Sequence, residues 1–233
     1  MGLFSRSYQP ISNSVAYEDA FSKNAFLQKV YSLFFVGLIM GAVGAVVTLS
    51  NPEILQLVAQ HPIITLILFV GMTFGVMAVR KVPVINIIAL LGFTFLSGAW
   101  LAPLVAVSVA QTGSFNTIFE ALGITGSIFI GLTAYVFISQ KDFTFMGGFI
   151  MVGLFSMIGL GIIGFFIHST IFELALAWIG AVLFSLFILY DTSRIMHSHQ
   201  SDEYVAATLG LYLDFINLFV DIAMILMNGG RRR

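Results

Sequence analysis

Long apolar segments recur along almost the whole chain, and they constrain the fold more than any other feature. Each is long enough to cross about 30 Å of hydrocarbon as an α-helix. Hydrophobic residues make up 59% of the chain and charged residues 9%, with a mean hydropathy of +1.01, which is far from soluble globular averages. The sequence therefore predicts an all-α integral membrane protein with seven transmembrane helices, at residues 30–49, 62–79, 82–107, 117–139, 145–167, 172–190 and 206–227.

These spans leave little of the 233 residues for other domains. We expect a polar cytoplasmic N-terminal tail at 1–28, a membrane domain at 29–228 and a short basic C-terminal tail at 229–233. The first segment lacks an apolar core before a cleavage site, so we interpret it as a tail and not as a signal peptide. In the third span, Pro103 is expected to kink or end the helix.

Composition also excludes several functions. Cysteine is absent, which excludes disulfides, thiolate catalysis and cysteine-based metal sites. A net charge of -1 argues against a nucleic acid partner. Gly37, Gly41 and Gly44 form a seam of small residues that most simply lets two helices pack closely, although an oligomer contact is the alternative.

The basic residues indicate the orientation, because cytoplasmic loops are enriched in lysine and arginine. The loops of one side hold all the basic loop residues, which predicts an integral protein of the cell membrane, in bacteria the inner membrane, with a cytoplasmic N-terminus. Seven spans would then place the three arginines at 231–233 outside. Either the loop charges dominate or the last segment is re-entrant, and we expect a full span. The basic loop residues are Arg6, Lys23, Lys29, Arg80, Lys81, Lys141 and Arg194.

Two aspartates, Asp191 and Asp214, lie inside the last two apolar segments. A carboxylate at membrane depth is costly, so it predicts a functional site. In an antiparallel hairpin, residues equidistant from the turn lie at one depth, and the midpoint of 191 and 214 falls between Asp202 and Glu203 in a polar loop. We therefore expect the two carboxylates at similar depth, displaced toward the cytoplasmic side and able to face each other.

This proximity predicts a proton-linked switch. Two close carboxylates in a poorly solvated site cannot both ionise easily, so they would share a proton. The ionised pair would attract a hard cation such as Ca²⁺. Asp214, Asn217 and Asp221 form a polar stripe that should face protein or water. The alternative is that Asp191 is a helix-end residue in the headgroup zone, paired with Arg194.

Four segments carry a family resemblance: Leu-Tyr-Leu-Asp-Phe-Ile-Asn-Leu-Phe at 211–219, Ile-Leu-Tyr-Asp at 188–191, Lys-Asp-Phe-Thr-Phe at 141–145, and Phe-Leu-Ser-Gly at 95–98 followed by a proline. Together they resemble the bacterial branch of the transmembrane BAX inhibitor motif family, over roughly residues 29 to 227. The resemblance implies seven helices with the last one central. It also implies a pH-sensitive Ca²⁺ leak without a bound cofactor, in which Ca²⁺ and H⁺ are the transported or regulatory ions.

The resemblance further implies roles for individual residues. Asp191 and Asp214 match the family's pH-sensing pair, and Arg80 fits an arginine that latches onto it. Glu120 is similar to an acidic position that attracts cations at the entrance. Simple membrane anchoring for Arg80 and an interfacial position for Glu120 are the alternatives. Some relatives carry a further acid in the second span, whereas residues 63–79 contain none.

Two other classes of function stay open. The chain could regulate stress or cell death by binding other membrane proteins, such as a membrane-bound protease, through its N-terminal tail and without essential ion flux. Intramembrane aspartyl proteases also use two aspartates on adjacent helices. Their second motif, however, has glycine two residues before the aspartate, where this chain has Tyr212, and their Pro-Ala-Leu segment is missing. We therefore expect no enzyme activity.

Overall fold

The computed structural model describes residues 20–167, 169–197 and 203–229. Within these ranges the chain is helical and has no strand, and seven helices are long and apolar enough to cross a membrane. The predicted fold class and number of spans are confirmed. The elements are α1 (Ala20–Leu49), α2 (Pro52–Gln60), α3 (Pro62–Val79), α4 (Ile85–Thr112), α5 (Asn116–Ser139), the 3-10 turn η2 (Thr144–Met146), α6 (Gly147–Phe166), α7 (Thr170–His197) and α8 (Tyr204–Gly229).

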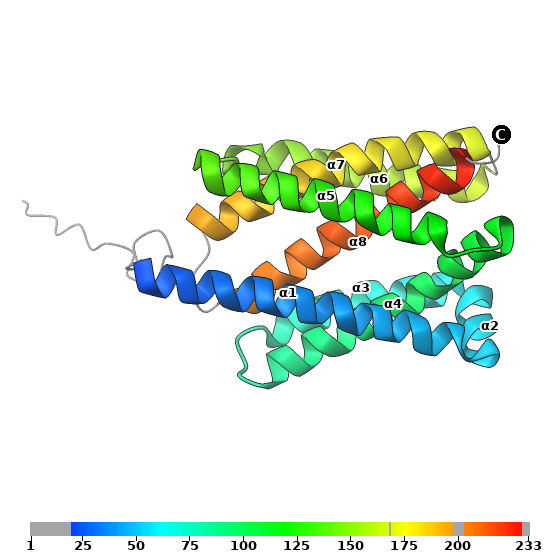
Figure 1. Cartoon of the computed structure of the whole chain (residues 1–233), viewed down its shortest axis with the longest axis horizontal. Coiled ribbons are helices and arrows are strands. Elements are labelled where there is room, and N and C mark those ends of the chain that lie inside the picture. Colours follow the sequence, from blue (N-terminus) through cyan, green and yellow to red (C-terminus); the bar gives the residue numbers. More distant parts are fainter. Residues whose placement is uncertain (1–19, 168, 198–202, 230–233) are drawn as a thin grey trace, which may run out of the picture.

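The long helices form two groups with α8 between them (Figure 1). Helices α1, α3 and α4 pack together on one side, and α5, α6 and α7 pack together on the other. Helix α8 crosses obliquely between the groups and contacts α1, α4, α5 and α7. It is the most enclosed span, with 56% of its apolar window buried. The expected central position of the last helix is confirmed. The surrounding helices shield the polar stripe of α8 from lipid.

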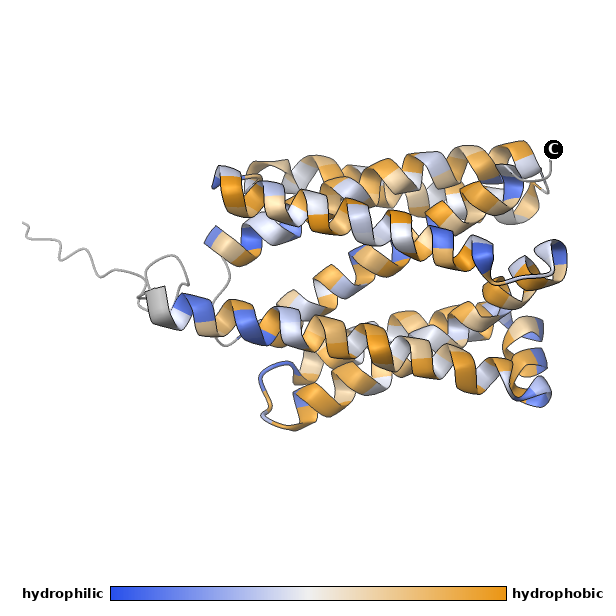
Figure 2. Cartoon of the chain, viewed as in Figure 1, coloured by the Kyte–Doolittle hydropathy of each residue, from blue (hydrophilic) through white to orange (hydrophobic). Residues whose placement is uncertain are grey.

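The outer surface of the bundle is apolar, as a lipid environment requires (Figure 2). Only 6% of the apolar window is buried in α3 and in α6, which form the outer parts of the two groups. Hydrophilic residues gather near the two ends of the bundle. We name the end that holds Arg80, Lys81, Lys141 and Arg194 the basic end, and the other the opposite end.

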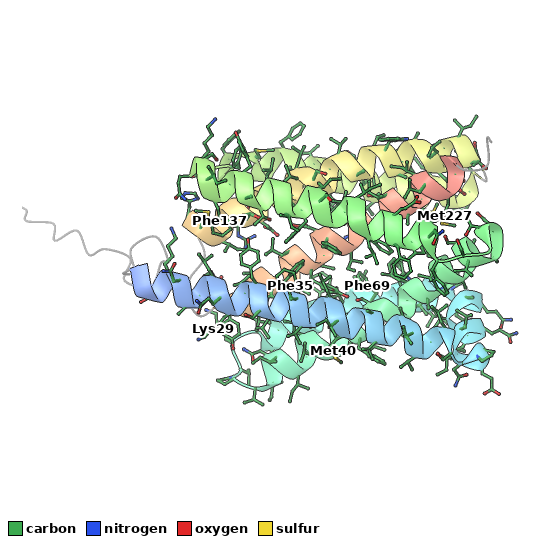
Figure 3. All side chains as sticks on the ribbon, viewed as in Figure 1. Lys29, Phe35, Met40, Phe69, Phe137 and Met227 are labelled. Atoms are coloured by element: carbon green, nitrogen blue, oxygen red, sulfur yellow. The ribbon has the colours of Figure 1, made fainter. Side chains whose placement is uncertain are left out.

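Side chains fill the space that separates the two groups in the ribbon view (Figure 3). An aromatic cluster of Phe34 on α1, Phe129 on α5 and Phe215 on α8 joins them. The ring centroid of Phe34 lies 4.7 Å from that of Phe129 and 5.7 Å from that of Phe215. Aromatic contacts of this kind stabilise beyond simple burial. The cluster therefore holds α8 against both groups.

Glycine brings α1 and α4 into backbone contact. A Cβ atom at Gly98 would overlap the carbonyl oxygen of Gly41, and one at Gly44 would overlap the carbonyl oxygen of Phe95. Small residues allow such close approach between membrane helices. The glycine seam of the first span thus packs against the Phe-Leu-Ser-Gly segment of the same chain.

Several element boundaries differ from the prediction. Helix α1 begins at Ala20, earlier than residue 30, and residues 1–19 lie outside the described part. The short helix α2 was not predicted; the side chain of Asn51 caps it by accepting from the backbone N–H of Glu53 at 3.2 Å, and Pro52 occupies its first position. Because α2 is shorter than a span, hydropathy alone does not reveal it.

Pro103 does not end the third span, which continues from Ile85 to Thr112. Gly113, with a left-handed φ of 71°, ends the helix instead, and its N–H donates to the carbonyl of Val109 at 2.8 Å. Interior proline is tolerated in membrane helices, since neighbouring helices can satisfy the freed backbone groups. Helix α8 is continuous from Tyr204 to Gly229, which fits a full span better than a re-entrant segment; residues 230–233 lie outside the described part.

Candidate functional site

The two aspartates lie on α7 and α8, which run antiparallel, and the end of α7 and the start of α8 lie at the basic end (Figure 1). The side chain of Asp191 is 14% exposed and Asp214 is 5% exposed. Helix α7 continues to His197, so Asp191 lies inside the helix and not at its last residue. Both acids are therefore held on regular helix within the bundle.

Asp191 and Asp214 share their surroundings with one arginine. The Asp191 Oδ1 atom lies 3.6 Å from Arg194 Nη1, one turn further along α7. Asp214 interacts electrostatically with both Asp191 and Arg194. Its Oδ2 atom is buried and has no hydrogen-bond partner among the described residues. The site thus combines two carboxyl groups with a single guanidinium group.

Glycine at position 210 leaves room for the carboxyl group of Asp191 on the surface of α8. A Cβ atom at Gly210 would lie 2.5 Å from Asp191 Oδ2. The carboxyl group of Asp191 therefore extends from α7 to the surface of α8. Asp214 is one turn further along α8, on the same face as Gly210. The contact at Gly210 therefore places Asp191 next to the turn that carries Asp214.

The opposite face of α8 is anchored to α1 and α4. Tyr212 is fully buried, and its hydroxyl lies 2.5 Å from Ser97 Oγ and donates to the carbonyl of Thr94 at 3.2 Å. The hydroxyl of Thr208 lies 3.3 Å from the carbonyl of Val30. Because each residue turns a helix by about 100°, residues 212 and 214 point to opposite sides. The anchoring hydroxyls therefore direct Asp214 away from α4 and toward α7.

The predicted latch residue, Arg80, lies at the basic end. Its Nη2 atom is 3.7 Å from Glu203 Oε1, and Lys81 Nζ is 3.8 Å from the same oxygen. Asn86 donates to the carbonyl of Arg80 at 2.9 Å and to the hydroxyl of Tyr204 at 3.2 Å. These contacts bind the connection between α3 and α4 to the start of α8. In this conformation the observed ion pair of Arg80 is thus with Glu203, a partner that sequence reasoning missed.

The other predicted site residues are spread along the bundle. Glu120 is exposed near the start of α5, at the opposite end from the aspartate pair. Asn217 is half-buried and donates to the carbonyl of Leu213 at 2.8 Å, so its amide is used within α8. Asp221 is half-buried against α7, where a Cβ atom at Gly180 would overlap its carboxyl group. The structure thus brings only Asp221 of these three into the α7–α8 contact.

The Lys-Asp-Phe-Thr-Phe segment supports the end of α7 near the site. Ser193 Oγ accepts from the backbone N–H of Phe143 at 2.8 Å and donates to Asp142 Oδ1 at 3.3 Å. Hydrogen bonds from Thr144 hold the pKa of Asp142 below its usual value, and the charge of His197 adds to this effect. Ser193 lies two residues after Asp191, so this segment positions the turn that carries the acid.

The site offers few ligands for a resident metal. Among residues 20–167, 169–197 and 203–229, no group of three or more acidic, histidine or cysteine side chains could hold a metal ion. Calcium prefers six to eight oxygen ligands.

Comparison with known proteins places this chain among relatives from several kingdoms. Residues 23–232 match the family described as "Inhibitor of apoptosis-promoting Bax1". An uncharacterized membrane protein of Vibrio cholerae is 34% identical over 212 residues, 90% of this chain and 92% of that protein. Bax inhibitor 1 of Schizosaccharomyces pombe is 35% identical over 206 residues, covering 87% and 76%. Protein lifeguard 4 of Mus musculus is 32% identical over 204 residues, covering 85% and 82%.

Proposed function

Because the chain belongs to the Bax inhibitor family, we propose that it is a pH-sensitive Ca²⁺ leak channel or transporter, gated by Asp191 and Asp214. The observation that carries the proposal is the environment of Asp214. This acid is 5% exposed, its Oδ2 atom lacks a partner among the described residues, and a second carboxyl group acts on it.

The charge balance of the site favours a proton-linked gate. Arg194 can compensate the charge of one carboxylate. The charge of the second carboxylate would then lack a compensating cation, which is costly in a poorly solvated site. The remaining carboxyl group therefore either keeps a proton or attracts a cation. Binding of Ca²⁺ and binding of a proton then compete for the same oxygens, which links ion passage to pH.

The gate also has a mechanical component. The Asp191 carboxyl group lies against Gly210 of α8, so a change in repulsion between the acids would act on the α7–α8 contact. Arg80 acts at the start of the same helix, where it pairs with Glu203. We assign Arg80 the role of a latch that restrains α8, and Glu120 that of a cation-attracting residue at the far entrance.

We further propose that the N-terminus and the basic end face the cytoplasm, in a bacterial inner membrane. The proposal is supported by the basic loop residues in the described part of the chain, which gather at that end. The chain has no native cysteine, so Lys141→Cys and Gln111→Cys each provide a single exposed thiol, one at each end of the bundle. An impermeant thiol reagent added outside intact cells is expected to label residue 111 and not residue 141; the reverse pattern would contradict this orientation.

A regulatory role is the second candidate, and the name of the fission yeast relative, Bax inhibitor 1, favours it. In that case the tail would bind another membrane protein and ion flux would be secondary. The test is a deletion of residues 1–19. The deletion leaves α1 intact, because that helix begins at Ala20 and contains Phe26, a core residue that is 2% exposed. Loss of a cellular phenotype with unchanged flux would support this role, and an unaffected phenotype would reject it.

The leak is tested in liposomes that contain a Ca²⁺-sensitive dye. The wild type is expected to pass Ca²⁺ at a rate that depends on pH, and Asp191→Asn and Asp214→Asn are expected to lose that dependence. Glu173→Gln is the matched control, because it removes an exposed acid from α7 outside the pair. No flux from folded wild-type protein, or an unchanged pH response in both variants, would contradict the proposal.

A further inference from the structure

Helices α7 and α8 carry the same spacing of a glycine and an aspartate. Gly180 precedes Asp191 by eleven residues on α7, and Gly210 precedes Asp221 by eleven residues on α8. Eleven residues make about three helical turns, so each glycine and its aspartate share one face. Because the helices are antiparallel, the glycine of each can face the aspartate of the other.

The structure contains both of these contacts. The carboxyl group of Asp191 lies against Gly210, and that of Asp221 lies against Gly180, where a Cβ atom would be 2.7 Å from Asp221 Cγ. Any side chain at residue 180 would therefore displace the acid. The second contact repeats the first one, further along the hairpin toward the opposite end.

Asp221 has no basic partner in the helices around it. Arg194 is the only lysine or arginine in α7, and α4, α5 and α8 contain none. The other acids of α5, α7 and α8 are Glu120, Glu173, Asp191 and Asp214. The basic residues of these helices are Arg194 and His197, both in the last turn of α7 at the basic end. The Oδ2 atom of Asp221 is buried and lacks a hydrogen-bond partner among the described residues. A mobile cation, a proton or water must therefore satisfy this group.

Helix α5 contributes a second unsatisfied oxygen in the same half of the bundle. Thr125 is fully buried, and its Oγ1 atom has no hydrogen-bond partner among the described residues. It lies on the buried face of α5, one turn from Phe129, whose ring contacts Phe215 of α8. Buried oxygens of this kind are the groups that ordered water or a hard cation satisfies.

We propose that Asp221, seated against Gly180, is a second carboxylate station for the transported cation. It follows Asp214 by seven residues on one face of α8, which is about 10 Å along the helix. The inference rests on the proposed leak function, and it gives the route a deep acid although residues 63–79 of the second span contain none. A cation leaving the Asp191/Asp214 pair then meets Asp221 before it reaches the opposite end.

The first test compares Asp221→Asn with Glu173→Gln in the liposome assay. Loss of a carboxylate–cation contact should lower Ca²⁺ flux by roughly tenfold, while the pH at half-maximal flux stays that of the wild type. Glu173→Gln should retain wild-type flux. Equal flux in the wild type and Asp221→Asn would overturn the proposed station and leave the proposed gate intact. Loss of the pH response in Asp221→Asn would also overturn a separate station, because Asp221 would then belong to the gate. A wild type without flux would overturn both proposals.

The second test detects water in the half of the bundle that holds Asp221, without measuring flux. Thr125→Cys places a thiol of similar size on the buried face of α5, and Ile130→Cys places one on its lipid face, where Ile130 is 66% exposed. A hydrophilic thiol reagent reacts only where water reaches. We expect faster modification at residue 125 than at residue 130, and slower modification at 125 when Ca²⁺ is added. No modification of residue 125 in protein that passes Ca²⁺ would overturn the route past Asp221.

Discussion

The α1–α4 pair and the α7–α8 pair both depend on glycine, but they use it differently. Between α1 and α4, Gly98 lies against the backbone of Gly41, and the result is close packing. Between α7 and α8, Gly180 and Gly210 receive carboxyl groups. The missing side chain thus makes room for backbone in one pair and for a titratable group in the other. The first arrangement allows close packing of two helices, whereas the second one places titratable groups inside the α7–α8 contact.

The largest expected effect is on the stability of the α1–α4 pair. In Gly98→Ala the new Cβ would overlap the Gly41 carbonyl, which cannot move without shifting a helix. Overpacking of this kind costs about 1–3 kcal/mol, and we expect a lower midpoint of unfolding in detergent. Gly92→Ala on the same helix is the control, because its Cβ would meet no atom within 4 Å. Equal loss in both variants would refute the close contact.

Gly210→Ala should separate the two uses of glycine. Its Cβ would meet Asp191 Oδ2, the end of a side chain that can rotate away, so the fold should survive. The displaced acid should shift the pH at half-maximal flux and weaken the pH response. The measurement is liposome flux against pH, with thermal unfolding as the check on folding. A variant with wild-type flux at every pH would show that the contact at Gly210 does not position Asp191.

Tyr212→Phe tests the anchoring face of α8. The change removes the hydroxyl that contacts Ser97 and the Thr94 carbonyl, and such bonds in membrane proteins contribute about 0.6–2 kcal/mol. We expect a modest loss of thermal stability with a retained pH response. In a double-mutant cycle, Ser97→Ala should cost little further in the Tyr212→Phe background. Fully additive losses would show that the two hydroxyls do not interact.

The smallest expected effect concerns Asp142, outside the spans. Its hydrogen bonds with Thr144 keep its pKa below the usual value, so its contribution to stability is present above the unfolded pKa of about 3.9. That contribution is lost as the pH falls through the lower folded pKa. Asp142→Asn should therefore unfold slightly more easily than the wild type at neutral pH, and the difference should vanish in strong acid. A difference that grows in acid would contradict this sign.

Hydropathy was sufficient to predict seven spans, because a bilayer restricts crossing segments to long apolar helices. The central position of the last helix was implied by the family resemblance and not by hydropathy. Hairpin symmetry also predicted that Asp191 and Asp214 lie at similar depth and are able to face each other. The partner of Arg80 and the contacts of Asp191 with Gly210 and of Asp221 with Gly180 were not predicted. These contacts depend on the rotation of each helix about its axis, which a pattern within one segment does not determine.

The length of α7 shows a related limit. The apolar segment was expected to end at residue 190, yet the helix continues to His197. Polar residues at its end are held by the connection before α6, through Ser193 and the backbone of Phe143. Hydropathy marks where a chain leaves hydrocarbon, whereas tertiary hydrogen bonds decide where its helix ends.

The central claim is that Asp191 and Asp214 act as one proton-sharing unit, and a double-mutant cycle on the pH response tests it most directly. Flux is measured against pH for the wild type, Asp191→Asn, Asp214→Asn and the double variant, all shown to be folded. Groups that act as a unit are non-additive, so each single change should abolish the pH response and the double variant should match the singles. Partial losses that add up in the double variant would show two independent acids and contradict the account.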